Sequence, residues 1–396
     1  MADTYAREAQ VPVTMECNGL APVPTCHQPC AAWRAATLAL FIAWSAPAAA
    51  EGFGASWTGD FATVASGGLD RSDRHMGLVE LTFDDGFVFA GRGNSLHLSA
   101  QHVYGGGFSE FQVGDLQTVS NIDADDGTRL FEAWVEVPLS EGSSVLLGRY
   151  DLNTEFDAIE AGGLFLSSSQ GVGPDISQTG AAGPSIFPRT AFGVRLQQRH
   201  EGGGILRGAA LDVEASSGTD YSDTPFAGGP MLILEYERPL QSARVKTGAW
   251  RFTRSKSGLS DPQDRDSEYG VYASIEREFA AGFVAYGRIG VANAEVSRID
   301  LYTGGGIVCT GGLLPDRDDS IGFAFGYARN GGEYLDAMHA EGVDVTSGEQ
   351  AYELTWRIPF GEHLVLQPDV QYVVDPGTDP DIGDALVLIL RVELSL

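Results

Sequence analysis

Basic residues are scarce in this sequence. Its 396 residues include 54 acidic but only 25 basic side chains, and lysine occurs only at Lys246 and Lys256. The net charge of -29 is the reverse of the positive surface that binds nucleic acid. The composition therefore argues against DNA or RNA as a partner.

Cysteine is also scarce, with four residues, and Cys17, Cys26 and Cys30 all precede a segment with the pattern of a signal peptide. Removal of that segment would leave Cys309 alone, and one cysteine makes no disulfide within a chain. The three early cysteines and His27 lack the paired spacing of structural zinc ligands. No metal site and no cofactor are expected.

Long apolar runs are missing too, because no segment approaches the roughly 18 uninterrupted apolar residues of a membrane helix. The run of ten from Ala35 to Trp44 follows Arg34 and precedes Ala48-Ala49-Ala50, which is the pattern of a signal peptide. We expect residues 1–50 to be a leader and signal peptide that is cleaved, and residues 51–396 to form one outer-membrane β-barrel domain. Without its first 50 residues the chain loses two of 25 basic and three of 54 acidic residues, and keeps a net charge of -28.

Glycine (51 residues) is abundant, and apolar and polar residues alternate in many short segments. At the C-terminus every even-numbered residue from Leu386 to Leu396 is apolar, while the odd-numbered ones include Arg391, Glu393 and Ser395. A period of two gives a strand one apolar and one polar face. A barrel wall with lipid outside and water inside requires such strands.

The whole pattern predicts an all-β fold, a transmembrane antiparallel β-barrel of about 16 strands. Short connections alternate with longer ones such as 104–128, 151–188 and 330–348, as in outer-membrane barrels. A soluble antiparallel sandwich also has strands with one apolar face, but it gives no reason for loops to be short at one end only. On the apolar parity, we expect Leu388, Leu390, Tyr352 and Trp356 to face lipid. By the same reasoning, Phe131 shares an apolar face with Ala133 and Val135.

Four strings of residues resemble a known family. They are 129–136 (RLFEAWVE), 148–157 (GRYDLNTEFD), 162–187 (GGLFLSSSQGVGPDISQTGAAGPSIF) and 366–374 (LQPDVQYVV). In content and order they resemble the carbohydrate-selective porins of the OprB type, from about residue 52 to the C-terminus. The resemblance implies a sixteen-stranded barrel with an aqueous pore that admits glucose and related sugars by diffusion. The chain departs from the pattern in ending on Leu396, where such barrels usually end in Phe.

The connection 151–188 contains too many apolar residues, such as Leu164, Phe165 and Leu166, to lie exposed in solvent. A sixteen-stranded barrel is wide, so a loop must supply the constriction. We therefore expect this third outer loop to fold into the lumen. The alternative is a lid packed over a neighbouring subunit. A homo-oligomer is possible, and the sequence does not decide the oligomeric state.

Sugars are bound by planar hydrogen-bonding groups and by aromatic rings. Glu132, Trp134 and Glu136 share the predicted lumen face of one strand, and Arg149 leads from the next strand into the long loop. The candidate sugar-binding or pore-lining residues are Glu132, Trp134, Glu136, Arg149, Asp151, Asn153, Glu155, Arg195, Arg357, Gln367, Asp369 and Arg391. Each of them has the alternative role of hydrating the wall or pairing across it.

The sequence predicts an outer-membrane porin of a Gram-negative bacterium, reached by export through the periplasm. It would allow passive diffusion of small sugars, with small carbohydrates and outer-membrane lipids as partners. A general or differently selective porin of the same architecture is the alternative, and a secreted β-rich surface-binding protein is a third hypothesis. An enzyme is not expected, because the histidines form no nucleophile-elbow or metal-binding motif. Residues 121–127 miss the spacing of a calcium loop, and 375–384 stay a candidate for weak calcium binding.

Overall fold

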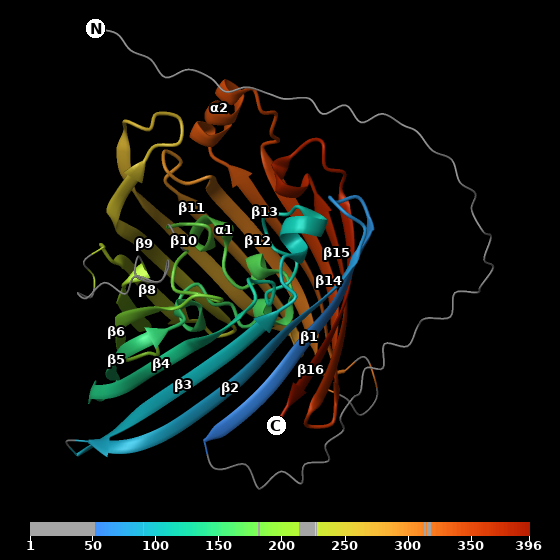
Figure 1. Cartoon of the computed structure of the whole chain (residues 1–396). Coiled ribbons are helices and arrows are strands. Elements are labelled where there is room, and N and C mark those ends of the chain that lie inside the picture. The colour runs from blue at the N-terminus through green and yellow to red at the C-terminus, as the bar shows by residue number, and fades with distance from the viewer. Residues whose placement is uncertain are drawn as a thin grey trace, which may run out of the picture. The chain divides into compact units, whose positions relative to one another are not determined.

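The structure, a computed structural model, describes residues 52–89, 91–180, 183–213, 226, 228–312, 314 and 318–396. The expected leader, residues 1–50, lies outside them. The described residues form sixteen strands that close into one barrel, each strand paired with its neighbours in the chain (Figure 1). The strands are β1 (Phe53–Ser66), β2 (Asp73–Phe89), β3 (Arg92–Tyr104), β4 (Gly127–Ser140), β5 (Ser143–Tyr150), β6 (Ala191–Arg199), β7 (Ile205–Leu211), β8 (Met231–Pro239), β9 (Ala243–Ser257), β10 (Arg265–Ala280), β11 (Phe283–Ala292), β12 (Ile299–Thr310), β13 (Ser320–Asn330), β14 (Gly348–Phe360), β15 (Leu364–Val374) and β16 (Ala385–Ser395).

Pairing of the first and last strands closes the barrel. β1 runs antiparallel to β16, with Trp57 opposite Leu394 and Phe61 opposite Leu390. A closed sheet has no free edge, so every strand finds its backbone hydrogen bonds within the wall. The predicted sixteen-stranded antiparallel barrel is confirmed.

Helical segments are short and lie in the connections. They are the helices α1 (Pro174–Ser177) and α2 (Gly332–Glu341), the π-helical turn η1 (Ser109–Val113), and the 3-10 turns η2 (Leu152–Thr154), η3 (Ala161–Leu164), η4 (Ser168–Gln170) and η6 (Pro376–Thr378). In the described part of the chain, no helix has the length and apolar character needed to cross a bilayer.

The connections are tight at one end of the barrel. Two residues, 141–142, join β4 to β5, and two more, 281–282, join β10 to β11. Gly282 has φ 75° and its Cβ would lie 2.4 Å from the carbonyl oxygen of Thr310, so this turn accepts only glycine. At the opposite end, 105–126 and 151–190 are long, which confirms the predicted alternation of loop lengths.

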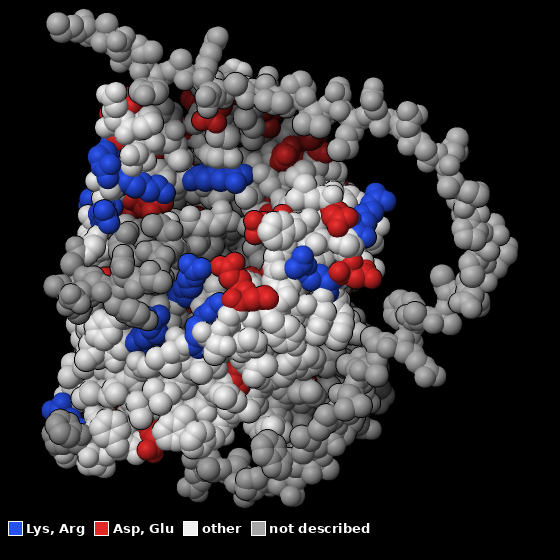
Figure 2. Space-filling view, viewed as in Figure 1, with Lys and Arg blue, Asp and Glu red and all other residues white. Residues whose placement is uncertain are grey.

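The outer face of the wall is apolar. Leu388 and Leu390 on β16 are 39% and 42% exposed, whereas the adjacent Val387 and Ile389 are 0% and 3% exposed. Leu354 lies between Tyr352 and Trp356 on the same face of β14 and is 49% exposed, so the orientation predicted for these side chains is confirmed. In Figure 2, the lower part of the molecule is mostly free of charged side chains, which gather toward the centre and top of the view.

The inner face of the wall carries more buried apolar side chains than the sequence suggested. Ile389, Val387, Val64 and Met76 form a buried apolar cluster on the inside of the wall. The loop 105–126 completes this cluster, with Phe108, Val113, Val119 and Ile122 packed against the wall residues. Apolar side chains on the inward parity of β1 and β16 therefore bind a loop and do not face water.

A β-bulge changes the parity of β4. Ser99 lies opposite Glu132 but Ala100 lies opposite Leu130, so Phe131 is an extra residue in the ladder. The prediction that Phe131 shares the outer face of Ala133 is wrong. Its side chain is 6% exposed and its ring contacts that of Phe187 in the long loop.

Neighbouring residues at the centre of β2 test the orientation of the wall. Leu81 is 57% exposed on the outer face, and Thr82 has the parity of Met76, which points inward and is 0% exposed. We expect Leu81→Arg to destabilise the barrel by about 2–4 kcal/mol in liposomes if it lies near the bilayer midplane, because lipid cannot solvate the guanidinium. Thr82→Arg, the matched control, should fold nearly as well as the native chain. Equal losses of folding yield, measured by heat-modifiable gel migration, would contradict the assigned register.

Candidate functional site

The connection 151–190 between β5 and β6 lies against the inside of the barrel wall. Its backbone N–H groups at Asp157 and Leu166 donate hydrogen bonds to Glu235 on β8 (2.8 Å) and Glu353 on β14 (2.5 Å). Glu235 and Glu353 are on the inward parity of their strands and are 1% and 2% exposed. Figure 1 shows this segment, in green with α1, between the front strands β2 to β4 and the back strands β10 to β13.

A buried arginine fixes the middle of this loop. Arg288 on β11 contacts Asp157 at 2.7 Å and Asp175 at 2.6 Å, and all three side chains are at most 3% exposed. Its guanidinium also lies over the rings of Tyr272 and Tyr302, 5.7 and 5.2 Å from their centroids. Removing one partner of such a group would leave an uncompensated charge in a low-dielectric site, which is strongly unfavourable. The loop is therefore held in place by electrostatics as well as by packing.

The connection 105–126 is a second loop inside the barrel. Glu349 on β14 accepts hydrogen bonds from the N–H groups of Leu116 (2.7 Å) and Gln117 (3.0 Å). Asp60 on β1 accepts a hydrogen bond from Ser120 (2.6 Å) and forms an ion pair with Arg391 (2.8 Å). Together the two loops contact the inner face of the wall from β8 through β16 to β1.

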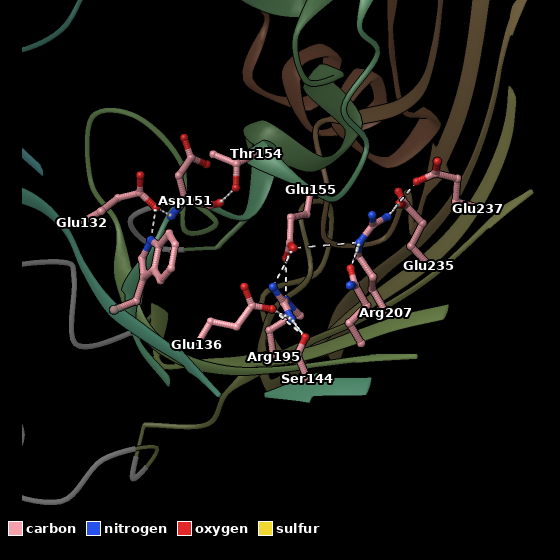
Figure 3. A network of polar contacts seen from close by, with 12 residues as sticks. Glu132, Glu136, Ser144, Asp151, Thr154, Glu155, Arg195, Arg207, Glu235 and Glu237 are labelled. Atoms are coloured by element: carbon pink, nitrogen blue, oxygen red, sulfur yellow. Dashed lines mark hydrogen bonds and ion pairs between the residues drawn. The ribbon is translucent and has the colours of Figure 1, made fainter. Parts of the chain in front are cut away.

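A network of charged side chains joins the long loop to the wall from β4 to β9 (Figure 3). Arg195 on β6 lies between two carboxylates, donating to Glu155 of the long loop at 2.7 Å and to Glu136 on β4 at 3.0 Å. Ser144 accepts a further bond from Arg195 at 2.9 Å and donates to Glu136 at 2.6 Å. The sequence predicted Glu136 and Arg195 as lumen residues and Glu155 as a residue of the loop, but not Ser144.

The network continues along the next strands. Arg207 on β7 lies 2.9 Å from Glu237 and 3.5 Å from Glu235. Arg244 on β9 contacts Glu160 of the long loop at 3.2 Å, and its side chain is 42% exposed. A cavity of about 500 Å³ lies between the long loop and the tight-turn end of the barrel. Glu160, Arg244 and Glu276 are among the residues that line it.

Glu132 and Trp134 on β4 form a second cluster with His97 on β3. Glu132 accepts hydrogen bonds from the indole N–H of Trp134 (3.2 Å) and from the backbone N–H of Asp151 (3.0 Å). The ring of His97 is stacked on that of Trp134, with 5.1 Å between centroids. One face of the indole is therefore covered by His97.

One predicted site residue is misplaced. Arg149 has the parity of Leu147, which is 51% exposed, whereas Leu146 and Tyr150 point inward and are buried. Arg149 thus lies on the outer face of β5, where it donates a hydrogen bond to the carbonyl oxygen of Thr190. The expectation of a lumen position was wrong because it followed the chain into the loop and not the alternation of the strand.

The remaining predicted residues lie inside the barrel, but several of them hold the loops. Gln367 donates to the carbonyl oxygen of Leu164 (2.8 Å), and Arg391 donates to Asn121 (2.8 Å). Asn153 bridges the carbonyl oxygens of Phe156 and Gly171 within the long loop. Two more are engaged with wall residues, Asp369 with Gln371 (2.9 Å) and Arg357 with Glu393 (3.0 Å).

Sequence reasoning missed most of the residues that fix the loops. They are Asp60, Asp157, Asp175, Arg207, Glu235, Glu237, Arg288, Glu349 and Glu353. The strand residues among them could have been found as polar side chains on the inward parity, as Glu235 and Glu237 are on β8. Their loop partners could not, because those contacts join residues far apart in the chain, as from Asp157 to Glu235.

Burial perturbs two carboxyls of the long loop. It raises the pKa of Asp151 to about 7, with Glu132 adding to the rise and the N–H of Asn153 opposing it. Burial also raises the pKa of Asp157 to about 6, although Arg288 favours the charged form. Among the described residues, no group of three or more metal-ligating side chains comes together, and Cys309 is a free thiol.

Comparisons with known proteins show one family by sequence and the porin fold by structure. The sequence matches the family model described as "Carbohydrate-selective porin, OprB family" over residues 88–396. The structure is similar to that of Pseudomonas putida OprB at high pH, with a TM-score of 0.77 and 16% identity over 87% of this chain and 94% of that one. It is also similar to the outer membrane channel DcaP of Acinetobacter baumannii (TM-score 0.55, 12% identity, 87% and 96% covered) and to a mutant of Rh. blastica porin (TM-score 0.53, 10% identity, 87% and 99% covered). No curated protein matches the chain at a significant level.

Asp151→Asn tests the electrostatics of the long loop. The folded-state pKa of Asp151 exceeds its ordinary value of 3.8, so ionisation destabilises the folded loop as the pH rises from about 4 to about 7. The amide keeps an acceptor for the Asn153 N–H but carries no charge. We expect the variant to have a higher free energy of unfolding than the native chain near pH 8 and the same value near pH 4, as measured by denaturant titration in detergent. A difference that does not change with pH would contradict this account.

Proposed function

The chain belongs to the carbohydrate-selective porin family, the OprB family, and on that premise we propose that it admits small, neutral, glucose-like sugars through the outer membrane. It is a passive channel of the outer membrane of a Gram-negative bacterium. The observation that supports the choice of substrate is the charged network formed by the wall and the long loop, where carboxylates and guanidinium groups alternate from Glu136 to Glu237. A sugar presents hydroxyl groups that both donate and accept hydrogen bonds, so alternating donors and acceptors can replace its water.

The residues that we propose as sugar contacts come from the network in Figure 3. They are Glu136, Glu155, Arg195, Arg207 and Glu237. Their mutual ion pairs keep each side chain in a fixed position and leave the wall with little mobile charge. Glu132 and Trp134 are proposed as a platform for the sugar beside this network. Stacking on His97 holds the indole ring in a fixed orientation.

Binding in such a channel must be weak. A site that conducts is attractive enough for a solute to enter and weak enough for it to leave. We therefore propose sugar affinities no tighter than about millimolar, or roughly -4 kcal/mol.

We also propose that export removes the leader, so that the mature chain begins near Glu51. N-terminal sequencing of protein recovered from outer membranes tests this, and a retained Met1 or Met15 would contradict it.

Sugar discrimination separates a carbohydrate-selective porin from a general one of the same architecture. We expect D-glucose to swell liposomes that contain the native protein faster than neutral solutes of equal size without a pyranose ring. The double variant Glu155→Gln/Glu237→Gln should lose this preference, because Arg195 keeps only Glu136 and Arg207 keeps only Glu235 as a charged partner, so neither guanidinium is held between two carboxylates. Swelling rates that follow solute size alone in both proteins would leave the general porin as the better description.

A further inference from the structure

Four neighbouring strands of the barrel, β5 to β8, are short. β7 has seven residues and β5 has eight, while β6 and β8 have nine each. β2 and β10, by contrast, have 17 and 16. A strand that crosses a bilayer needs about 9–11 residues at a tilt of about 45°. At that tilt β7 rises roughly 17 Å, which is less than the apolar band of about 25 Å around outer-membrane barrels.

The outward face of these four strands is apolar. Leu147, Leu196 and Leu234 are each more than half exposed on it. In Figure 1, β5, β6 and β8 follow one another up the left of the view, with β9 beyond them. Where a hydrophobic wall is lower than the hydrocarbon layer, the bilayer thins locally. Thinning brings the lipid headgroups closer to the outer ends of these strands.

Two arginines flank the short strands on the lipid face, at the end of the long connections. Arg149 is the last residue but one of β5 and lies opposite Phe192 of β6, which is exposed. Arg251 of β9 lies opposite Leu232, the second residue of β8, which is also exposed. Directly opposite residues of an antiparallel pair share one face of the sheet. Both guanidinium groups therefore lie on the outside of the wall, on the side of the outer leaflet.

Neither arginine has a carboxylate partner among the described residues. Arg149 donates to the carbonyl oxygen of Thr190, and Arg251 donates to the hydroxyl of Ser267 at 3.2 Å. Arg329, on the outward face of β13, is instead neutralised by Asp300 at 2.8 Å. An unpaired charge on a lipid-facing wall is unfavourable, and an anionic group at headgroup level would remove that cost.

A phosphorylated lipid fits this face better than a second copy of the chain. Arginine binds phosphate in a bidentate geometry, and basic groups at the membrane surface recognise anionic headgroups. A second copy related by a twofold axis would place the same face against itself, so the arginines would meet apolar side chains or each other. Four strand spacings separate Arg149 from Arg251, roughly 19 Å. A wide headgroup with two phosphates, or two lipids side by side, can reach both.

We propose that the lipid face between Arg149 and Arg251 is a binding site for a phosphorylated glycolipid of the outer leaflet, of the lipopolysaccharide class. The two arginines bind phosphate, and the exposed leucines and Phe192 contact the acyl chains. The site lies on the outside of the barrel and takes no part in the passage of sugar. It therefore does not rest on the proposed substrate.

Lipid A with two phosphates is the probe. Native mass spectrometry counts the lipid bound to the folded, delipidated barrel in detergent, with a chelator present so that divalent cations do not bridge phosphate to carboxylates. We expect the native protein to bind lipid A. Arg149→Gln and Arg251→Gln should each weaken binding by roughly tenfold or more, because a charge-assisted bond to phosphate is lost. Unchanged binding in both variants would overturn the site.

Arg277→Gln is the matched control. Arg277 shares the lipid face of β10 with Ile275 and Phe279, which are exposed, but it lies at the tight-turn end. It forms no ion pair within the described residues, so only its leaflet differs from that of the two proposed ligands. We expect this variant to bind lipid A as the native protein does. An equal loss would show a general attraction to positive charge and would overturn the site.

The remaining arms separate a lipid from the other occupants. Heat-modifiable migration without lipid checks that each variant folds. Lipid A without phosphates should bind the native barrel as weakly as the phosphorylated lipid binds the double variant Arg149→Gln/Arg251→Gln. Full competition by inorganic phosphate would mean an anion site without lipid, and a native dimer cross-linked through β5 to β8 would mean a second copy. Either result would overturn the proposal.

Discussion

Buried charge on the inner wall is the constraint on which the rest of the interior depends. The side chain of Arg288 is only 3% exposed, and its charge is tolerated there because Asp157 and Asp175 contact it. Both aspartates belong to the loop 151–190. A wall without the loop would hold an unpaired arginine, and a loop without the wall would hold two carboxylates with no cation. Asp60 and Arg391 form an ion pair within the wall, and this pair also bonds to Ser120 and Asn121 of the loop 105–126. The pore is thus what remains after charge pairing has fixed both loops.

Much of the wall could be predicted from sequence because its rule is local. Successive side chains of a strand in a closed barrel face outward and inward in turn, so the positions of Leu388 and Leu390 in the sequence predicted that they face outward. Turns such as the one at Gly282 indicated where strands reverse. The rule fails where the ladder is irregular. Phe131 changed sides because a bulge inserts one residue, and Arg149 was misplaced because proximity to a loop was given more weight than parity.

The interior could be predicted only in part, because its contacts join residues far apart in the chain. An apolar third loop indicated an inward fold, but nothing near Glu349 or Leu116 indicates that they meet across more than 200 residues. The second loop was missed for this reason, and with it the apolar cluster around Ile389. Several residues predicted to touch sugar, among them Gln367 and Arg391, are instead engaged with the loops. A polar side chain on the inward face can serve either role, and the sequence does not tell which.

The central claim is that loops fixed by buried charge, and not the wall alone, determine what passes through the channel. Single-channel conductance of Arg288→Met in planar bilayers tests it most directly. The substitution leaves Asp157 and Asp175 without their cation while the closed ladder of strands stays intact. The account predicts a larger and noisier conductance together with loss of block by glucose, because the freed loop no longer narrows the lumen. A native conductance with native glucose block would contradict it.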